Sequence, residues 1–141
     1  MGIDHEIFET LAKRTLPEGI SLQMIDAGGT VLFEDSGKWL HPLFSLEHFL
    51  KGRKIDTSCC MLHDRISGKA AAGLTSRLGF KYVKADMISA LAIDLYERNG
   101  VSYIYDVKVD SIMCLTEKLL KDIDDITAIY RIIEERRRIP Y

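Results

Sequence analysis

The second half of the sequence alternates between two kinds of segment, and this alternation limits the possible folds more than any other feature. Apolar stretches at residues 58–62, 80–88 and 101–106 have the length and composition of strands. The segments between them, 65–79 and 89–100, have helical spacing and each contains a glycine near its end. Strands that alternate with helices in this way form crossover units, so the sequence predicts three parallel strands in one sheet.

The first half predicts an antiparallel pair of strands between two helices. Asp4 is a candidate N-cap for a helix over residues 4–15. Residues 20–26 and 30–34 alternate apolar and polar side chains around a short glycine loop, which is typical of a β-hairpin. A short helix is expected at 41–52, because a proline lies in its first turn and a glycine at its end.

Two further helices are expected within residues 115–138, separated by a pair of aspartates. The sequence shows no linker or internal repeat, so residues 1–141 are expected to form a single domain. The expected fold class is therefore α/β: a three-layer α-β-α sandwich around a mixed five-stranded sheet, in which an antiparallel hairpin joins three parallel strands.

Composition excludes several classes of partner. Of the 141 residues, 28% are charged and 47% apolar, and the net charge is −2. Such a chain has no global field that would attract nucleic acid or an anionic membrane, and no apolar run long enough to span a bilayer. Three cysteines without a framework spacing favour a reducing compartment, so a cytoplasmic location is expected.

The segment HDRISGKAAAGL, residues 63–74, raises the question of a binding site. Asp64 is expected where a strand meets a helix, and the small residues that follow allow close approach of the helix backbone. One interpretation is a capped helix packed tightly on the sheet. In the other, Ser67, Gly68 and Lys69 bind a phosphate or carboxylate at the helix N-terminus. A nucleotide triphosphatase loop is excluded because no glycine precedes Gly68 in this stretch.

Three stretches resemble a small family of prokaryotic proteins of unknown function. They are DRISGKAAA at 64–72, ADMISALA at 85–92 and MCLTEKLLKDIDD at 113–125, and the resemblance extends over about residues 18–128. The family has the cytidine-deaminase-like fold. The resemblance implies an α-β-α sandwich and a cleft, but no reaction.

Individual positions follow from the family's motifs. Asp64, Gly68 and Lys69 match the pattern Asp-x-x-x-Gly-Lys-Ala-Ala-Ala, and Ser89 matches a serine after the next strand. The Met-Cys-x-x-Glu-Lys motif is matched at Cys114, Glu117 and Lys118. The sequence departs from the family at Leu115, where a proline is usual, and in the loop before residue 113, which is shorter.

The zinc ligands of deaminases with this fold are missing from their expected places. These enzymes use zinc to activate water, with a glutamate that transfers protons. The corresponding helix starts read KWLHP, without an acid, and HDRISG, without a cysteine. The nearest alternative ligands are His41, Cys60, His63 and Asp64, whose spacing fits no standard zinc arrangement. No metal and no cofactor are therefore expected.

Other candidate groups have two interpretations each. Cys114 lies at the start of a helix with Glu117, where a thiolate is favoured, although a buried inert cysteine is the simpler reading. Asp86 and Ser89 follow a strand and line the same cleft as Asp64, or Ser89 simply caps the next helix.

Three hypotheses follow. In the first, the protein binds or senses a nucleotide-like, phosphate-bearing molecule, with Lys69 on the anion, Asp64 on a hydroxyl or amine, and Ser89 orienting the ligand. In the second, it is an enzyme without zinc, in which Asp64 is a general base, Lys69 stabilises charge, Cys114 is a nucleophile and Glu117 lies beside it. In the third, it is a structural homo-oligomer. The first is preferred because it accounts for the missing zinc ligands.

Overall fold

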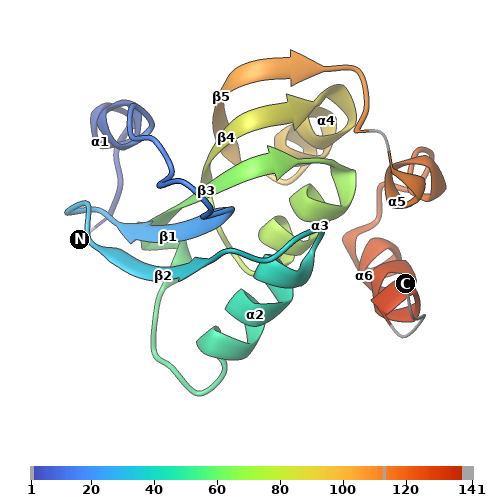
Figure 1. Ribbon diagram of the computed structural model, residues 1–141, viewed down its shortest axis with the longest axis horizontal. Coiled ribbons are helices and arrows are strands. Elements are labelled where there is room, and N and C mark those ends of the chain that lie inside the picture. Colours follow the sequence, from blue (N-terminus) through green and yellow to red (C-terminus); the bar gives the residue numbers. More distant parts are fainter. Residues whose placement is uncertain (1, 113, 138–141) are drawn as a thin grey trace.

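The computed structural model describes residues 2–112 and 114–137, and its centre is a mixed sheet with the strand order β2-β1-β3-β4-β5 (Figure 1). β1 is antiparallel to both of its neighbours, whereas β3, β4 and β5 are mutually parallel. The predicted hairpin and three parallel strands are therefore confirmed. The strands are β1 Leu22–Asp26, β2 Val31–Asp35, β3 Cys60–Ser67, β4 Tyr82–Ser89 and β5 Ser102–Val109.

Helices lie on both faces of the sheet, but very unequally. They are α1 His5–Leu11, α2 His41–Leu50, α3 Lys69–Arg77, α4 Ala90–Arg98, α5 Leu115–Leu119 and α6 Ile126–Arg137. The larger core lies between one face and α2, α3, α4 and α6. On the other face α1 packs Phe8 and Leu11 against Ile25, Met61 and Tyr82. In the part of the chain that the structure describes, this outer layer is one helix of seven residues. Much of that face is therefore left to polar side chains.

The run of small residues in α3 lets a second helix approach closely. Seven consecutive residues of α3, from Lys69 to Thr75, are buried. A Cβ atom at Gly73 would lie 2.8 Å from the Cγ2 atom of Ile129, so α6 can pack at this distance only because the position is glycine. The small residues thus serve close packing, as expected, but at Gly73 the close neighbour is helix α6 rather than the sheet.

The junction between β3 and α3 differs from the sequence expectation. The predicted strand over 58–62 and helix over 65–79 correspond to β3 at Cys60–Ser67 and α3 at Lys69–Arg77. Polar residues after Leu62 suggested the end of the strand, yet the strand continues and alternates them between its two faces. Asp64 therefore lies inside β3 and does not cap α3, which corrects the expectation made for it.

Other boundaries differ less. α1 ends at Leu11 rather than at residue 15, because the chain turns through Ala12. The predicted pair of C-terminal helices is confirmed as α5 and α6, and residue 138 lies outside the described residues. No helix among the described residues is long and apolar enough to cross a membrane.

Two neighbouring leucines test how firmly α5 is attached. Leu120 is fully buried, whereas Leu119 is 45% exposed. We expect Leu120→Ala to lower the free energy of unfolding by about 2 to 5 kcal/mol, since it empties a core position. The matched change Leu119→Ala should cost less than about 0.5 kcal/mol. Urea denaturation of both variants measures this, and equal losses would show that α5 is not packed on the core.

Candidate functional site

A pocket of about 390 Å³ lies beyond the carboxyl end of β3. It is bounded by the first turns of α2 and α3 and by the segment that leads from β5 into α5. Figure 1 shows the arrowheads of β3, β4 and β5 pointing toward this end of the molecule, where α5 and α6 are placed. Ligand sites in open α/β sheets occur at this edge. Most of the lining is apolar, including Leu40, Pro42, Leu43, Ile66, Ala70, Ala71 and Ile112.

Asp64 supplies a buried carboxyl group to this pocket. It comes from β3 and is only 8% exposed. Its Oδ2 atom has no hydrogen-bond partner among the described residues. Burial raises the pKa of Asp64 to about 8, and hydrogen bonds from the amides of Ile66 and Arg65 oppose this rise only in part. At neutral pH the carboxyl group therefore holds its proton and can donate as well as accept a hydrogen bond.

The carboxylate at the start of α3 comes from Glu117. The backbone amide of Lys69, the first residue of α3, donates to Glu117 Oε2 at 2.7 Å, and the amide of Ile112 donates to Oε1 at 3.3 Å. Glu117 is 2% exposed and lines the pocket. A Cβ atom at Gly68, the N-cap residue, would lie 2.7 Å from Glu117 Oε2. Gly68 is therefore required for the close approach of this carboxylate.

The side chain of Lys69 extends to the C-terminal helices. Its Nζ atom donates to Asp124 Oδ1 at 2.8 Å and to the carbonyl of Lys121 at 3.1 Å, and the residue is 1% exposed. The hydrogen bond from Lys69 lowers the pKa of Asp124 below its usual value. Lys69 is not among the residues that line the pocket. Its ammonium group thus fastens the loop between α5 and α6 to α3.

The two predicted serines make internal hydrogen bonds. The Ser67 hydroxyl is 2.7 Å from the hydroxyl of Tyr96, inside the core. The amide of Ala92 donates to Ser89 Oγ at 3.0 Å, so Ser89 caps α4, which was one of its two predicted roles. Neither serine lines the pocket.

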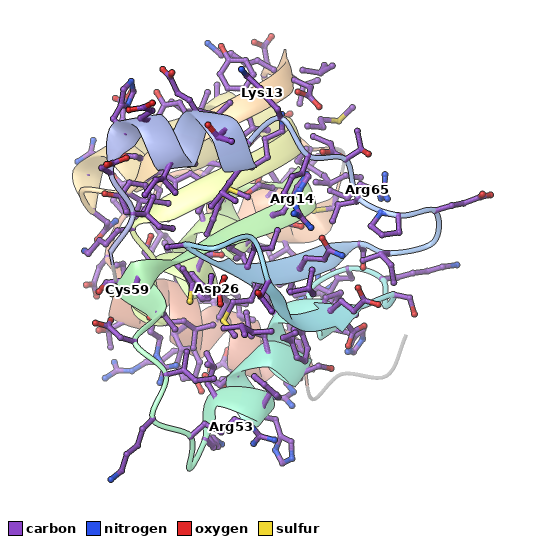
Figure 2. All side chains as sticks on the ribbon, turned by 90° about the vertical axis from the view of Figure 1, so that its left-hand side faces the viewer. Lys13, Arg14, Asp26, Arg53, Cys59 and Arg65 are labelled. Atoms are coloured by element: carbon purple, nitrogen blue, oxygen red, sulfur yellow. The ribbon has the colours of Figure 1, made fainter. Side chains whose placement is uncertain are left out.

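Asp86 lies on the opposite face of the sheet from Asp64. Its carboxylate is 2.8 Å from His63 Nε2 and 3.4 Å from a guanidinium nitrogen of Arg65. Arg65 also donates to the carbonyls of Ile20 and Pro17 in the loop after α1. Figure 2 looks onto this side of the molecule, with α1 in front of the strands and Arg65 beside that loop. The structure therefore does not bring Asp86 together with Asp64.

Cys114 lines the pocket with Asp64, Gly68 and Glu117. Its Sγ atom accepts a hydrogen bond from the amide of Glu117 at 3.4 Å and caps α5. Four of the sequence candidates thus meet at one pocket.

The alternative metal ligands do not form a cluster, although Cys60, His63 and Asp64 all lie on β3. The ring of His41, at the start of α2, packs against Trp39 and Phe44. His63 is buried on the α1 face, and burial lowers its pKa. The thiol of Cys60, at the start of β3, is 3.8 Å from a backbone carbonyl. No group of three metal-ligating side chains occurs within residues 2–112 and 114–137.

Comparison with known proteins places the chain in a family. The family model described as a domain of unknown function, DUF1893, matches residues 12–136. The chain belongs to the DUF1893 family. A DUF1893 family protein (TM1506) from Thermotoga maritima, whose crystal structure is known, is similar with a TM-score of 0.77 and 25% identity, covering 95% of this chain and 92% of the other. None of the curated proteins matches this sequence.

Sequence reasoning missed one prominent side chain of this DUF1893 pocket. Trp39 lines it and has a φ of 55°, a left-handed conformation that bulky residues rarely adopt. The signal was present, because the chain's single tryptophan stands just after Gly37 and before a helix that begins with proline. Lys38, exposed at the rim of the pocket, was also not singled out.

The contact between Gly68 and Glu117 can be tested by a single methyl group. We expect Gly68→Ala to displace the Glu117 carboxylate and to lower the free energy of unfolding by about 1 to 2 kcal/mol, as when a helix cap is lost. Gly28→Ala is the control, because its Cβ atom would make an ordinary 3.4 Å contact with Asp26. Thermal and urea unfolding measure the stability of both variants. If Gly68→Ala is as stable as wild type, the close contact between Gly68 and the Glu117 carboxylate is refuted.

The raised pKa of Asp64 makes the stability of the protein depend on pH. The folded state keeps the proton up to about pH 8, whereas the unfolded state loses it near 3.8. Between these values the folded form binds more protons, so stability falls as pH rises, by up to about 1.4 kcal/mol per pH unit. Asp64→Asn removes this dependence. Its stability relative to wild type should therefore rise from pH 5 to pH 8 and level off above.

Urea denaturation across that pH range measures the difference between the two proteins. Asp110→Asn, at an exposed position, is the control and should follow the wild-type curve. Parallel curves for wild type and Asp64→Asn would show that Asp64 is ionised in the folded protein at neutral pH.

Proposed function

We propose that the pocket of this DUF1893 protein binds a small, planar, nucleotide-like molecule. The observation that carries the proposal is the carboxyl group of Asp64, which lines the pocket and whose buried Oδ2 atom has no hydrogen-bond partner among the described residues. A buried polar group left unpaired costs about 1 to 3 kcal/mol. A ligand that forms a hydrogen bond with this group recovers that free energy. Asp64 is therefore expected to contribute to the affinity for the ligand and to fix its orientation in the pocket.

The protonated state of Asp64 indicates the kind of ligand. A neutral carboxyl group offers one donor and one acceptor side by side. The edge of a heterocyclic base presents the complementary pair, a ring nitrogen with an adjacent carbonyl or amine. The apolar walls of the pocket suit the faces of such a ring.

Trp39 supplies an aromatic surface at the same pocket. Its ring makes T-shaped contacts with the rings of His41 and Phe44, at centroid distances of 5.5 and 5.7 Å. The left-handed backbone of Trp39 costs about 1 to 2 kcal/mol, and strain of this kind is concentrated at ligand sites. Aromatic rings stack well on tryptophan, so this side chain is suited to a planar ligand.

The charged end of the ligand is assigned to Lys38. A phosphate-bearing ligand was expected to meet Lys69 and the first amides of α3, but Lys69 Nζ bonds Asp124 and its amide bonds Glu117. Lys38 is exposed at the rim and provides a cation there. The phosphate of the ligand is therefore expected to bind at the pocket entrance beside Lys38, and not at Lys69.

Two broader expectations also remain proposals. The strand order, with a hairpin joined to three parallel strands, supports a cytidine-deaminase-like fold, in which this pocket takes the position of the active site. The three cysteines are free thiols, which supports a cytoplasmic location. Binding is preferred to catalysis because the Cys114 thiol caps α5 and Lys69 lies away from Asp64.

Trp39 is the chain's single tryptophan, so its fluorescence reports directly on the pocket. We expect saturable changes with at least one nucleoside 5′-monophosphate, after native mass spectrometry has shown which masses copurify. Asp64→Leu should abolish the change. Lys38→Met should weaken monophosphate binding by about ten-fold, equivalent to 1.4 kcal/mol, and leave the nucleoside unaffected. Lys54→Met, at an exposed position outside the pocket lining, is the matched control and should bind like wild type. No saturable change with any nucleotide would refute the proposal.

A further inference from the structure

The strand β5 leaves one long edge of the sheet open. It pairs with β4 on one side, and no described strand pairs with its other side. Figure 1 shows it at the upper border of the sheet. β5 has eight residues without proline or glycine, and Tyr105 and Val107 are 40% and 50% exposed. Proteins usually block such edges, because unpaired backbone groups recruit another strand.

The pairing with β4 determines which backbone groups face outward. The amide of Ser102 donates to Lys81 on the β4 side at 2.8 Å, and the parallel register continues without a bulge to Val109. Successive residues of a strand direct their N–H and C=O groups to alternate sides. Tyr103, Tyr105, Val107 and Val109 therefore present both groups at the open edge.

The charges of β5 make this edge complementary to itself. Asp106 and Lys108 flank Val107 and both are exposed, and one oxygen of Asp106 also accepts a hydrogen bond from Lys84 of β4 in the same chain. When two copies pair antiparallel about a two-fold axis at Val107, Asp106 of each copy faces Lys108 of the partner subunit. Val107 then lies opposite Val107 of the partner subunit, and Tyr105 lies opposite Val109 of the partner subunit. All of these residues direct their backbone N–H and C=O groups to the open edge, so they can form the hydrogen bonds between the two strands. Opposite charges directly across two strands stabilise the pair.

Other registers lack this match. A two-fold axis at Tyr105 also aligns outward backbone groups, but it places Asp106 opposite Ile104 and Lys108 opposite Ser102. The sequence of β5 therefore selects one register among those that can form hydrogen bonds.

We propose that the open edge of β5 is the interface of a homodimer, in which two copies form one continuous sheet through antiparallel pairing about Val107. The side chains of Tyr105 and Val107 become covered in this arrangement. Tyr105 already stacks on Tyr103, and Tyr103 on Tyr96 of α4, with centroid distances of 6.4 Å. These stacked rings connect β5 to α4. The interface is independent of the proposed ligand.

Sedimentation velocity of the full chain over a wide concentration range tests the interface. We expect wild type to be a dimer. Val107→Pro removes an outward N–H without touching the ladder to β4, and should raise the dissociation constant by at least about a hundred-fold. Lys108→Asp places like charges opposite each other and should weaken the dimer strongly. Lys54→Glu, in an exposed loop remote from β5, is the charge-change control and should remain dimeric.

A mixture distinguishes this register from a general electrostatic effect. Lys108→Asp chains should be monomeric alone and form a heterodimer with Asp106→Asn chains, because Asp106 of the first chain then still faces Lys108 of the second and the like-charge contact is gone. Asp106→Asn keeps a hydrogen-bond acceptor for the buried Lys84 of its own chain. Circular dichroism shows whether each variant is folded. If Val107→Pro does not fold, the result for Lys108→Asp decides whether this edge is the dimer interface. A monomeric wild type at all concentrations, or a dimer that survives both Val107→Pro and Lys108→Asp, would overturn the proposal.

Discussion

The backbone amide of Lys69 and the carboxylate of Glu117 form the hydrogen bond on which the rest of the site depends. Glu117 satisfies amides at the start of α3 and before α5 with its two oxygens, and it can do so only because Gly68 has no side chain. The Lys69 ammonium group then holds the α5–α6 loop a few residues further on. Lys69 thus joins the C-terminal segment to α3 twice. The wall of the pocket that contains Cys114 and Glu117 is positioned by these contacts.

The sheet separates two polar environments that differ in chemistry. On the pocket side Asp64 is buried among apolar residues with an oxygen that lacks a protein partner. On the α1 side His63 Nε2 and Arg65 contact the carboxylate of Asp86, and His63 Nδ1 has no partner among the described residues. Because Asp64 lines the pocket whereas His63 does not, the hydrogen bond that a ligand could supply is expected on the Asp64 side.

Much of the fold was predictable from the sequence, and the roles of single residues much less so. Strands and helices were located because their apolar spacing reflects one buried face, which does not depend on distant contacts. The end of β3 was misplaced because HDRIS is polar, and only the neighbouring strand shows that Asp86 can satisfy His63. The sequence suggested that Lys69 binds an anionic ligand. Its actual partner, Asp124, lies 55 residues away in the sequence, so the pair could not be recognised from local patterns. The motifs did identify Asp64, Gly68, Cys114 and Glu117, which line one pocket.

The alternation of side chains in β3 has a consequence for how such a pocket changes through insertions and deletions. His63 and Asp64 are neighbours in sequence but belong to opposite faces of the sheet, and the period of a strand is two residues. Loss of one residue upstream in β3 would turn every following side chain to the other face, so that His63 and Arg65 point to the pocket side and Asp64 to the α1 side. Point substitutions can alter the pocket gradually, whereas a single-codon deletion here would replace its chemistry in one step. Length changes in this family should therefore collect in the loops and avoid β3.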